Sequence, residues 1–240
     1  MSGPRSSERR AAGDAGDAGD AGDAPLVLRA QALLFDLDGV LVDSSASVER
    51  QWRRWAARHG LDGDALMRVV HGRRAADTIR EVAPWLDAER EVREVLAPAE
   101  AADVDGNVAI PGAAALLAGL PADRWAVVTS CVPDVAAGRL RSVGLPLPRV
   151  LVTAADVARG KPDPEGYRLG AARLGAPPER CVVFEDAPAG LAAARAAGAR
   201  SVAVATTHAA AELTGDAIVA TLAEVRARVG EDGVEVVVAG

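Results

Sequence analysis

Residues 31–40, QALLFDLDGV, join a short apolar run to two acidic residues and a glycine. The run at 31–35 has the length and composition of a buried β-strand, and Asp36-Leu37-Asp38-Gly39 is typical of the turn that follows one. In an open parallel sheet, ligands bind at the carboxyl ends of the strands. The segment therefore predicts a parallel sheet whose binding site includes Asp36 and Asp38.

The chain beyond residue 109 alternates between strands and helices. Apolar runs at 125–129, 150–153, 181–184 and 201–205 are separated by helical stretches rich in Ala and Leu at 133–143, 164–174 and 189–197. This βαβ alternation predicts an α/β fold with a Rossmann-like parallel sheet. A last apolar run, at 234–238, is expected to be an edge strand.

An inserted segment interrupts this core early in the chain. From 47 to 108, apolar residues such as Trp52, Trp55 and Ala56 recur at helical spacing, with charged residues between them. We therefore expect a catalytic core from 26–46 and 109–240, with a helical cap at 47–108. Residues 1–25 are acidic and repeat Gly-Asp-Ala, and are expected to be a disordered tail.

The composition restricts the partners and the compartment. The net charge of −7 argues against nucleic acid or an anionic membrane as a partner. Cys131 and Cys181 are too few for a disulfide framework and fit a reducing cytoplasm. The sequence shows neither the apolar core of a signal peptide nor an apolar run long enough to span a membrane. We expect a cytoplasmic monomer or weak dimer.

The ends of the other predicted strands carry polar side chains of matching chemistry. Thr129 and Ser130 end the second strand, Lys161 follows the third across a short loop, and Glu185-Asp186 follows the fourth. Carboxylates suit a hard cation such as Mg²⁺, while a hydroxyl and an ammonium suit phosphate oxygens. Lys161 is also the single Lys among 27 basic residues. Together these side chains predict a magnesium and phosphate site.

Each of these features also has a structural explanation when it is taken alone. Residues 36–39 could be a simple turn, Ser130 a helix cap, Glu185-Asp186 a helix start, and Lys161 a solvated side chain in an Arg-biased composition. Their occurrence at four strand ends in this order is hard to explain structurally, because so many charges at one sheet edge repel one another without a cation.

The four motifs resemble those of the haloacid dehalogenase superfamily. The first is D-x-D-G-V at 36–40, the second is Ser130 or Thr129 in V-V-T-S, the third is Lys161 in G-K-P-D-P, and the fourth is Glu185-Asp186. The helical insert is similar to the small α-helical cap of this superfamily. The resemblance extends from about residue 26 into the mid-200s and implies a magnesium-dependent phosphatase.

The resemblance implies a role for each motif residue. Asp36 is the nucleophile that forms an aspartyl phosphate, and Asp38 is the acid and base. Lys161 neutralises charge, and Ser130 (or Thr129) holds phosphate oxygens. The implied Mg²⁺ ligands are Asp36, the backbone carbonyl of Asp38, and Asp186, with Glu185 as a ligand or as a partner behind the ligands.

The cap contains one unusual stretch, His71-Gly72-Arg73-Arg74, followed by Asp77. It is either a helix-connecting loop with solvated arginines or a loop that reaches into the site and binds the substrate. The stretch resembles the cap of yeast glycerol and 2-deoxyglucose phosphatases, and the chain resembles bacterial sugar and hexitol phosphatases. Both resemblances imply a small phosphorylated sugar or polyol as the substrate.

Three alternatives remain at this point besides an inactive scaffold. A β-phosphoglucomutase has a His and an Arg at positions that match Val48 and Ala75, although Arg73 or Arg74 could replace that Arg. A receiver domain also uses Asp, Ser or Thr, Lys and Mg²⁺, but its acidic pair comes earlier and it has no helical insert. A true haloacid dehalogenase lacks the second Asp of the first motif, which is present here as Asp38.

Overall fold

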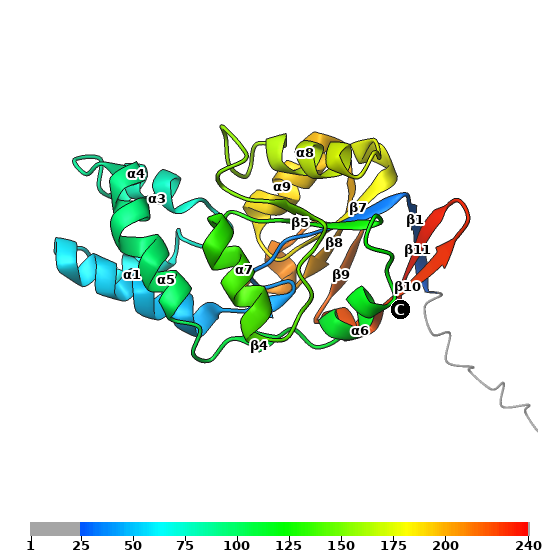
Figure 1. The fold of residues 1–240 in the computed structure, drawn as a ribbon, viewed down its shortest axis with the longest axis horizontal. Coiled ribbons are helices and arrows are strands. Elements are labelled where there is room, and N and C mark those ends of the chain that lie inside the picture. Colours follow the sequence, from blue (N-terminus) through cyan, green and yellow to red (C-terminus); the bar gives the residue numbers. More distant parts are fainter. Residues whose placement is uncertain (1–24, 240) are drawn as a thin grey trace, which may run out of the picture.

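A parallel β-sheet forms the centre of the computed structural model, which describes residues 25–239 (Figure 1). In that range, six strands lie in the order β6-β5-β2-β7-β8-β9 and all pairs are parallel. Their bounds are β2 (Ala32–Phe35), β5 (Trp125–Val128), β6 (Val150–Val152), β7 (Cys181–Glu185), β8 (Arg200–Val204) and β9 (Ala217–Val219). The predicted α/β fold is confirmed. The predicted acidic tail lies outside the described residues, apart from Pro25.

The strand order places β2 at the point where the chain changes direction across the sheet. The chain proceeds outward from β2 to β5 and β6, then returns to the other side of β2 for β7, β8 and β9. The crevice at such a switch point, beyond the carboxyl end of the strand, is where open α/β sheets bind ligands. Asp36 follows the last residue of β2 directly.

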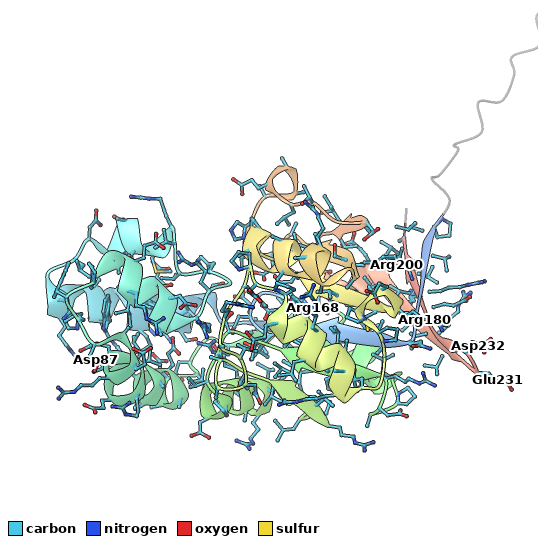
Figure 2. The ribbon with its side chains drawn as sticks, turned by 90° about the horizontal axis from the view of Figure 1, so that it is seen from above. Asp87, Arg168, Arg180, Arg200, Glu231 and Asp232 are labelled. Carbon is cyan, nitrogen blue, oxygen red and sulfur yellow. The ribbon has the colours of Figure 1, made fainter. Side chains whose placement is uncertain are left out.

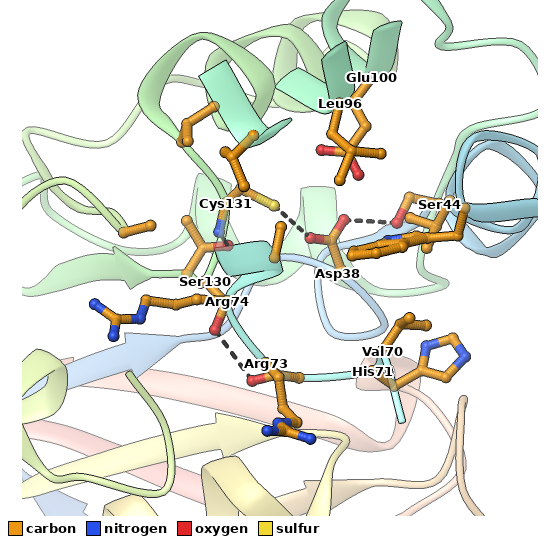
Figure 3. Close-up of a pocket in the computed structure, with 18 of the residues that line it drawn as sticks. Asp38, Ser44, Val70, His71, Arg73, Arg74, Leu96, Glu100, Ser130 and Cys131 are labelled. Atoms are coloured by element: carbon orange, nitrogen blue, oxygen red, sulfur yellow. Dashed lines mark hydrogen bonds between the residues drawn. The ribbon is translucent and has the colours of Figure 1, made fainter. Parts of the chain in front are cut away.

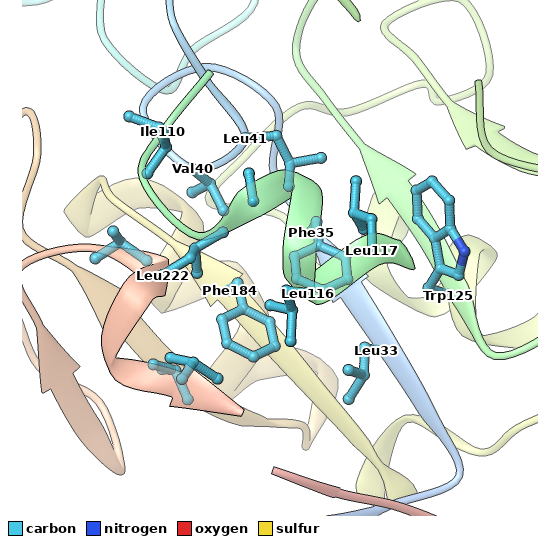
Figure 4. Packing of buried hydrophobic residues seen from close by; sticks show 14 of the residues in the cluster. Leu33, Phe35, Val40, Leu41, Ile110, Leu116, Leu117, Trp125, Phe184 and Leu222 are labelled. Carbon is cyan, nitrogen blue, oxygen red and sulfur yellow. The ribbon is translucent and has the colours of Figure 1, made fainter. Parts of the chain in front are cut away.

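Helices cover both faces of the sheet. On one face, α8 (Glu165–Arg173) and α9 (Pro188–Ala197) contribute Tyr167 and small residues such as Ala171 and Ala194 to a buried cluster. On the other face, α6 (Ala113–Ala118) and α7 (Pro133–Ser142) contribute to the buried cluster that contains Phe35 and Phe184. Leu116 and Leu117 of α6 lie beside the two rings (Figure 4). The two rings are stacked with centroids 4.7 Å apart. This packing fixes β2 and β7 side by side, with their polar ends at the same edge.

The apolar run at 234–238 is not an edge strand of this sheet. It forms β11 (Gly233–Val238), the middle strand of a separate antiparallel sheet between β1 (Leu26–Ala30) and β10 (Val225–Gly230). Val234, Val236 and Val238 are buried while the residues between them are less so. That alternation is typical of an antiparallel strand with one face on the core. The sequence prediction failed because neither β1 nor β10 was recognised as a partner.

A helical cap lies between two short antiparallel strands, β3 (Val42–Asp43) and β4 (Val108–Ala109). Its helices are α1 (Ser45–His59), α2 (Gly63–Met67), α3 (Ala75–Val82), α4 (Ala88–Glu91) and α5 (Ala97–Ala102), with one π-helical turn at Val92–Leu96. Trp52, Trp55, Ile79 and Leu96 form its own apolar core. Charged side chains such as Asp87 point outward from the cap, as Glu231 and Asp232 do from the β10–β11 hairpin (Figure 2). Over residues 25–239, the structure contains no helix long and apolar enough to cross a membrane.

Candidate active site

A buried ammonium group joins two carboxylates at the carboxyl end of β2. Lys161 Nζ donates to Asp36 Oδ1 at 2.7 Å and to Glu185 Oε1 at 2.5 Å. The side chain of Lys161 is 7% exposed and that of Glu185 is fully buried. The pairing of Phe35 with Phe184 sets Asp36 beside Glu185, and the loop between β6 and α8 brings Lys161 to both. Residues 125 positions apart in the sequence therefore meet in one ion-pair network.

The carboxylate of Glu185 is saturated by donors of the protein. Its Oε1 accepts from Lys161 Nζ and Tyr167 Oη, and its Oε2 accepts from the backbone N–H groups of Asp186 and Ala187. A Cβ on Gly190 would come within 1.7 Å of Oε1, so only glycine leaves room for the carboxylate. Because four donors bond to its two oxygens, Glu185 holds Lys161, Tyr167 and the backbone at 186–187 in position.

The carboxylates at this edge carry more negative charge than the single ammonium group of Lys161 can neutralise. Burial, opposed by Lys161, raises the pKa of Asp36 to about 7, with Glu185 and Asp38 adding to the rise. Burial and the charges of Glu185 and Asp36 also raise the pKa of Asp186. Burial disfavours the ammonium form of Lys161, yet Asp36 and Glu185 raise its pKa overall. One ammonium therefore faces a larger number of negative groups.

The donor set at this edge fits a divalent cation. One oxygen each from Asp36, Glu185 and Asp186 lies within 4.8 Å of the others. Asp186 Oδ1 is buried and has no hydrogen-bond partner among the residues described, while its Oδ2 accepts from Thr207 Oγ1. An orphaned carboxylate oxygen beside two further carboxylates is the arrangement that a hard cation satisfies.

The second acidic residue, Asp38, is held by three donors from three different segments. Ser44 Oγ at the start of α1 donates to Oδ1 at 2.6 Å and the Cys131 thiol donates to Oδ2 at 3.0 Å (Figure 3). Arg139 Nη1 of α7 also donates to Oδ2, at 2.7 Å. Arg139 itself is buried. These donors hold both oxygens of the Asp38 carboxylate in place.

The two candidate hydroxyls have different environments. Ser130 Oγ donates to the backbone carbonyl of Gly72 in the cap loop at 3.0 Å. Thr129 Oγ1 accepts from the Cys131 N–H, and its own proton has no acceptor within the described part of the chain. Thr129 also continues the sheet, since its N–H donates to Val152. The free hydroxyl donor at the strand end is therefore that of Thr129.

The arginines of the cap loop are paired with protein groups. Arg74 forms a two-pronged ion pair with Asp77 and donates from Nη1 to the carbonyls of Val157 and Ala158 in the core. Arg73 pairs with Glu81 of α3. Both side chains extend away from Asp38 in Figure 3. His71 lies against His208, with ring centroids 6.4 Å apart.

A cavity of about 280 Å³ separates the core from the cap. Asp36, Asp38, Thr129 and Asp186 line its core side, and the cap loop closes one flank. The remaining cap wall is mostly apolar, with Val48, Trp52, Val70, Val92 and Leu96. The predicted site residues except Lys161 and Glu185 line this cavity, and those two lie directly behind Asp36.

Four contributors were not recognised in the sequence: Ser44, Tyr167, Arg139 and Glu100. Tyr167 and Arg139 lie on helices whose other residues are ordinary core or surface positions, and no motif distinguishes them. Ser44 follows the first motif closely, and its position at the start of a predicted helix was the one available signal.

Comparisons with known proteins agree with this geometry. The family model for haloacid dehalogenase-like hydrolases matches residues 30–198, and the chain belongs to this family. It is 45% identical to hexitol phosphatase A of Escherichia coli over 74% of this chain and 84% of that protein. It is 37% identical to glycerol-1-phosphate phosphohydrolase 2 of Saccharomyces cerevisiae, over 76% of this chain and 78% of the yeast protein.

The fold is also similar to that of a hydrolase from Pseudomonas syringae, with a TM-score of 0.70 and 28% identity over 79% of this chain and 92% of that chain. Family membership makes the protein a hydrolase with phosphatases as its relatives. Family membership also excludes the alternative interpretation of the chain as a phosphoacceptor receiver domain.

The increase in thermal stability that Mg²⁺ binding produces should become larger as the pH rises. Burial raises the pKa of Asp36 in the folded state to about 7, whereas the ordinary pKa of Asp is 3.8. The stability of the metal-free protein therefore falls between these pH values, because the unfolded chain releases the proton of Asp36 first. A bound cation replaces the proton and removes this loss. Thermal unfolding with and without saturating Mg²⁺ should show a small increase in Tm at about pH 5 and a larger one at about pH 8.

Asp186→Asn is the matched variant for this measurement, because it removes one charge and keeps the shape of the side chain. It should flatten the dependence of the Mg²⁺ effect on pH. An increase in Tm that is equal at both pH values in the wild type would contradict a cation site at these carboxylates.

Proposed function

We propose that the protein is a Mg²⁺-dependent phosphomonoesterase that hydrolyses small sugar or polyol phosphates through an aspartyl phosphate on Asp36. The observation that carries this proposal is the buried network of Lys161, Asp36 and Glu185 beside the orphaned oxygen of Asp186. Such a network positions one carboxylate and leaves room for a cation and a phosphate. Bound by Asp36, Asp186 and the backbone carbonyl of Asp38, Mg²⁺ would supply positive charge to the phosphate oxygens.

The nucleophile is the free oxygen of Asp36. Oδ1 is held by Lys161, while Oδ2 accepts no hydrogen bond from residues 25–239. In the first step Oδ2 attacks phosphorus, the bond to the ester oxygen breaks, and Asp38 gives its proton to the leaving alcohol. In the second step Asp38 takes a proton from water, which attacks the phosphorus, and the Asp36 carboxylate leaves with release of phosphate.

Glu185 and Lys161 act by holding the nucleophile. Because Glu185 is saturated by four donors, we assign it the role of orienting Lys161 and the chain at Asp186, and not that of a direct metal ligand. Lys161 lowers the pKa of Asp36 against the effect of burial, which favours the ionised form as the anionic phosphate approaches.

Thr129 is the proposed phosphate-binding hydroxyl, because its proton is free and it ends β5. Ser130 instead links the core to the cap loop through Gly72. Arg74 has a similar role, since its guanidinium group is engaged by Asp77 and the core carbonyls. The stretch 71–74 then shapes the cavity, with His71 and the backbone of Gly72 on its wall.

A phosphatase fits the cavity better than a mutase does. A mutase must also bind the second phosphate of its sugar bisphosphate intermediate, which needs an uncompensated cation. Val48 and Ala75 line the cavity without charge, and the nearby Arg73 and Arg74 are neutralised by Glu81 and Asp77. The substrate class follows the hexitol and glycerol-1-phosphate phosphatases that the chain resembles.

Asp36→Asn should abolish Mg²⁺-dependent phosphate release while the protein remains folded. The amide is nearly isosteric but cannot attack phosphorus. The measurement is phosphate release from hexitol phosphates, glycerol 1-phosphate, 2-deoxyglucose 6-phosphate and phosphoglycolate, together with circular dichroism. Asp123→Asn, at an exposed position, is the control and should behave as the wild type. Turnover of Asp36→Asn at the wild-type rate would eliminate the mechanism.

Thr129→Val and Ser130→Ala should separate the two hydroxyls. Loss of a hydrogen bond to a charged group costs roughly 1.5–3 kcal/mol, so Thr129→Val should lower kcat/KM by about 10- to 100-fold on every phosphate ester, including p-nitrophenyl phosphate. Thr129→Ser retains the donor and should recover most of the activity. Ser130→Ala should have the smaller effect. The reverse order would assign the phosphate-binding role to Ser130.

A further inference from the structure

One carboxylate that lines the cavity has neither a role in the proposed chemistry nor a hydrogen-bond donor among the described residues. Glu100 of α5 lines the cavity from the cap side, and its side chain is 13% exposed. Within residues 25–239 no group donates a hydrogen bond to it. Figure 3 shows Glu100 and Leu96 projecting from the cap into the space above Asp38. A mostly buried carboxylate without a donor is costly unless a ligand satisfies it.

The local backbone brings Glu100 into this position. The helix is widened by the π-turn Val92–Leu96, where the Ala97 N–H donates to the Val92 carbonyl. Such turns are rare and are frequently found at functional sites. Val92, Leu96, Ala97 and Glu100 all line the cavity, so apolar residues of the same helical segment lie beside the carboxylate. Burial in this wall raises the pKa of Glu100, opposed by Arg139.

The nearest cation does not account for Glu100. Arg139 Nη2 lies 3.9 Å from Glu100 Oε1, which is beyond hydrogen-bond distance, while Arg139 Nη1 donates to Asp38 at 2.7 Å. Arg139 thus already donates a hydrogen bond to Asp38, and it lies between Asp38 and Glu100. A group that bonds to Glu100 therefore lies on the same side of the cavity as the acid that protonates the leaving oxygen.

We propose that Glu100 is a specificity-determining residue that accepts hydrogen bonds from hydroxyl groups of the leaving polyol. This inference rests on the proposed function and defines the substrate class within it. Hydroxyl donors satisfy the carboxylate, and its charge repels substrates that carry a second phosphate or a carboxylate. A substrate without these hydroxyls leaves the buried carboxylate unpaired and is rejected.

The test is binding in the Asp36→Asn background, where no turnover occurs. The dissociation constants of a hexitol 6-phosphate and of inorganic phosphate are measured by calorimetry with Mg²⁺, with and without Glu100→Gln. An amide keeps one acceptor but loses the charge, and we expect about 10- to 100-fold weaker binding of the hexitol phosphate. Binding of inorganic phosphate should stay within about threefold. Glu94→Gln, the same change at an exposed position of the same helical segment, is the control and should alter neither.

Kinetics in the wild-type background distinguish this role from a structural one. Glu100→Gln should raise KM for the hexitol phosphate and leave kcat/KM for p-nitrophenyl phosphate nearly unchanged. An equal loss on both substrates would show that Glu100 acts through Arg139 and Asp38, and would overturn the proposal. Unchanged affinity for the hexitol phosphate would overturn it while the phosphatase function stands. If the hexitol phosphate fails to bind even with Glu100 intact and no ester is hydrolysed, the proposed function itself is wrong and the inference falls with it.

Discussion

The buried ammonium of Lys161 is the interaction on which the rest of the site depends. It bonds to Asp36 and Glu185 at once, in a place where water contributes little to its solvation. Removing one partner from such a network would leave an uncompensated buried charge. The neighbouring residues hold the network in place. Tyr167 and two backbone N–H groups hold Glu185, and Gly190 leaves room for it. The negative charge that these donors do not neutralise lies on Asp36 and Asp186, and a cation fits at these two carboxylates.

The cap and the core meet around this charge network through polar contacts that frame the cavity. Ser130 reaches Gly72, Arg74 reaches the carbonyls of Val157 and Ala158, and Ser44 and Arg139 hold Asp38. We expect a cap joined in this way to exclude water from a bound phosphate and to strengthen the charge interactions there. These contacts engage Arg74, and Arg73 pairs with Glu81, so both arginines of the cap loop have protein partners. Selection among substrates is left to the apolar wall and to Glu100, which has no protein donor in the described structure.

Sequence periodicity and strand-end chemistry predicted the sheet, a helical cap at 47–108 and a site at the ends of β2, β5 and β7, and of these the sheet is confirmed. They could do so because buried strands are short apolar runs and because parallel strands bring their ends together. They could not identify Arg139. Its contact with Asp38, 101 residues earlier in the sequence, depends on how α7 packs against the core. Nor could the charge of Arg74 reveal that Asp77, three residues on, would neutralise it. The β1-β11-β10 sheet was missed for a related reason, because its pairing joins the two ends of the core.

The most direct test of this account is the activity of Lys161→Arg. A guanidinium group is larger, planar and forked, so it cannot occupy the space of a compact ammonium between Asp36 and Glu185. The reverse exchange at a nearby exposed residue, Arg159→Lys, provides the control and should leave the activity unchanged. We predict that Lys161→Arg folds with native circular dichroism and loses at least about 100-fold in Mg²⁺-dependent phosphate release. Near-wild-type release by a folded Lys161→Arg protein would contradict the account.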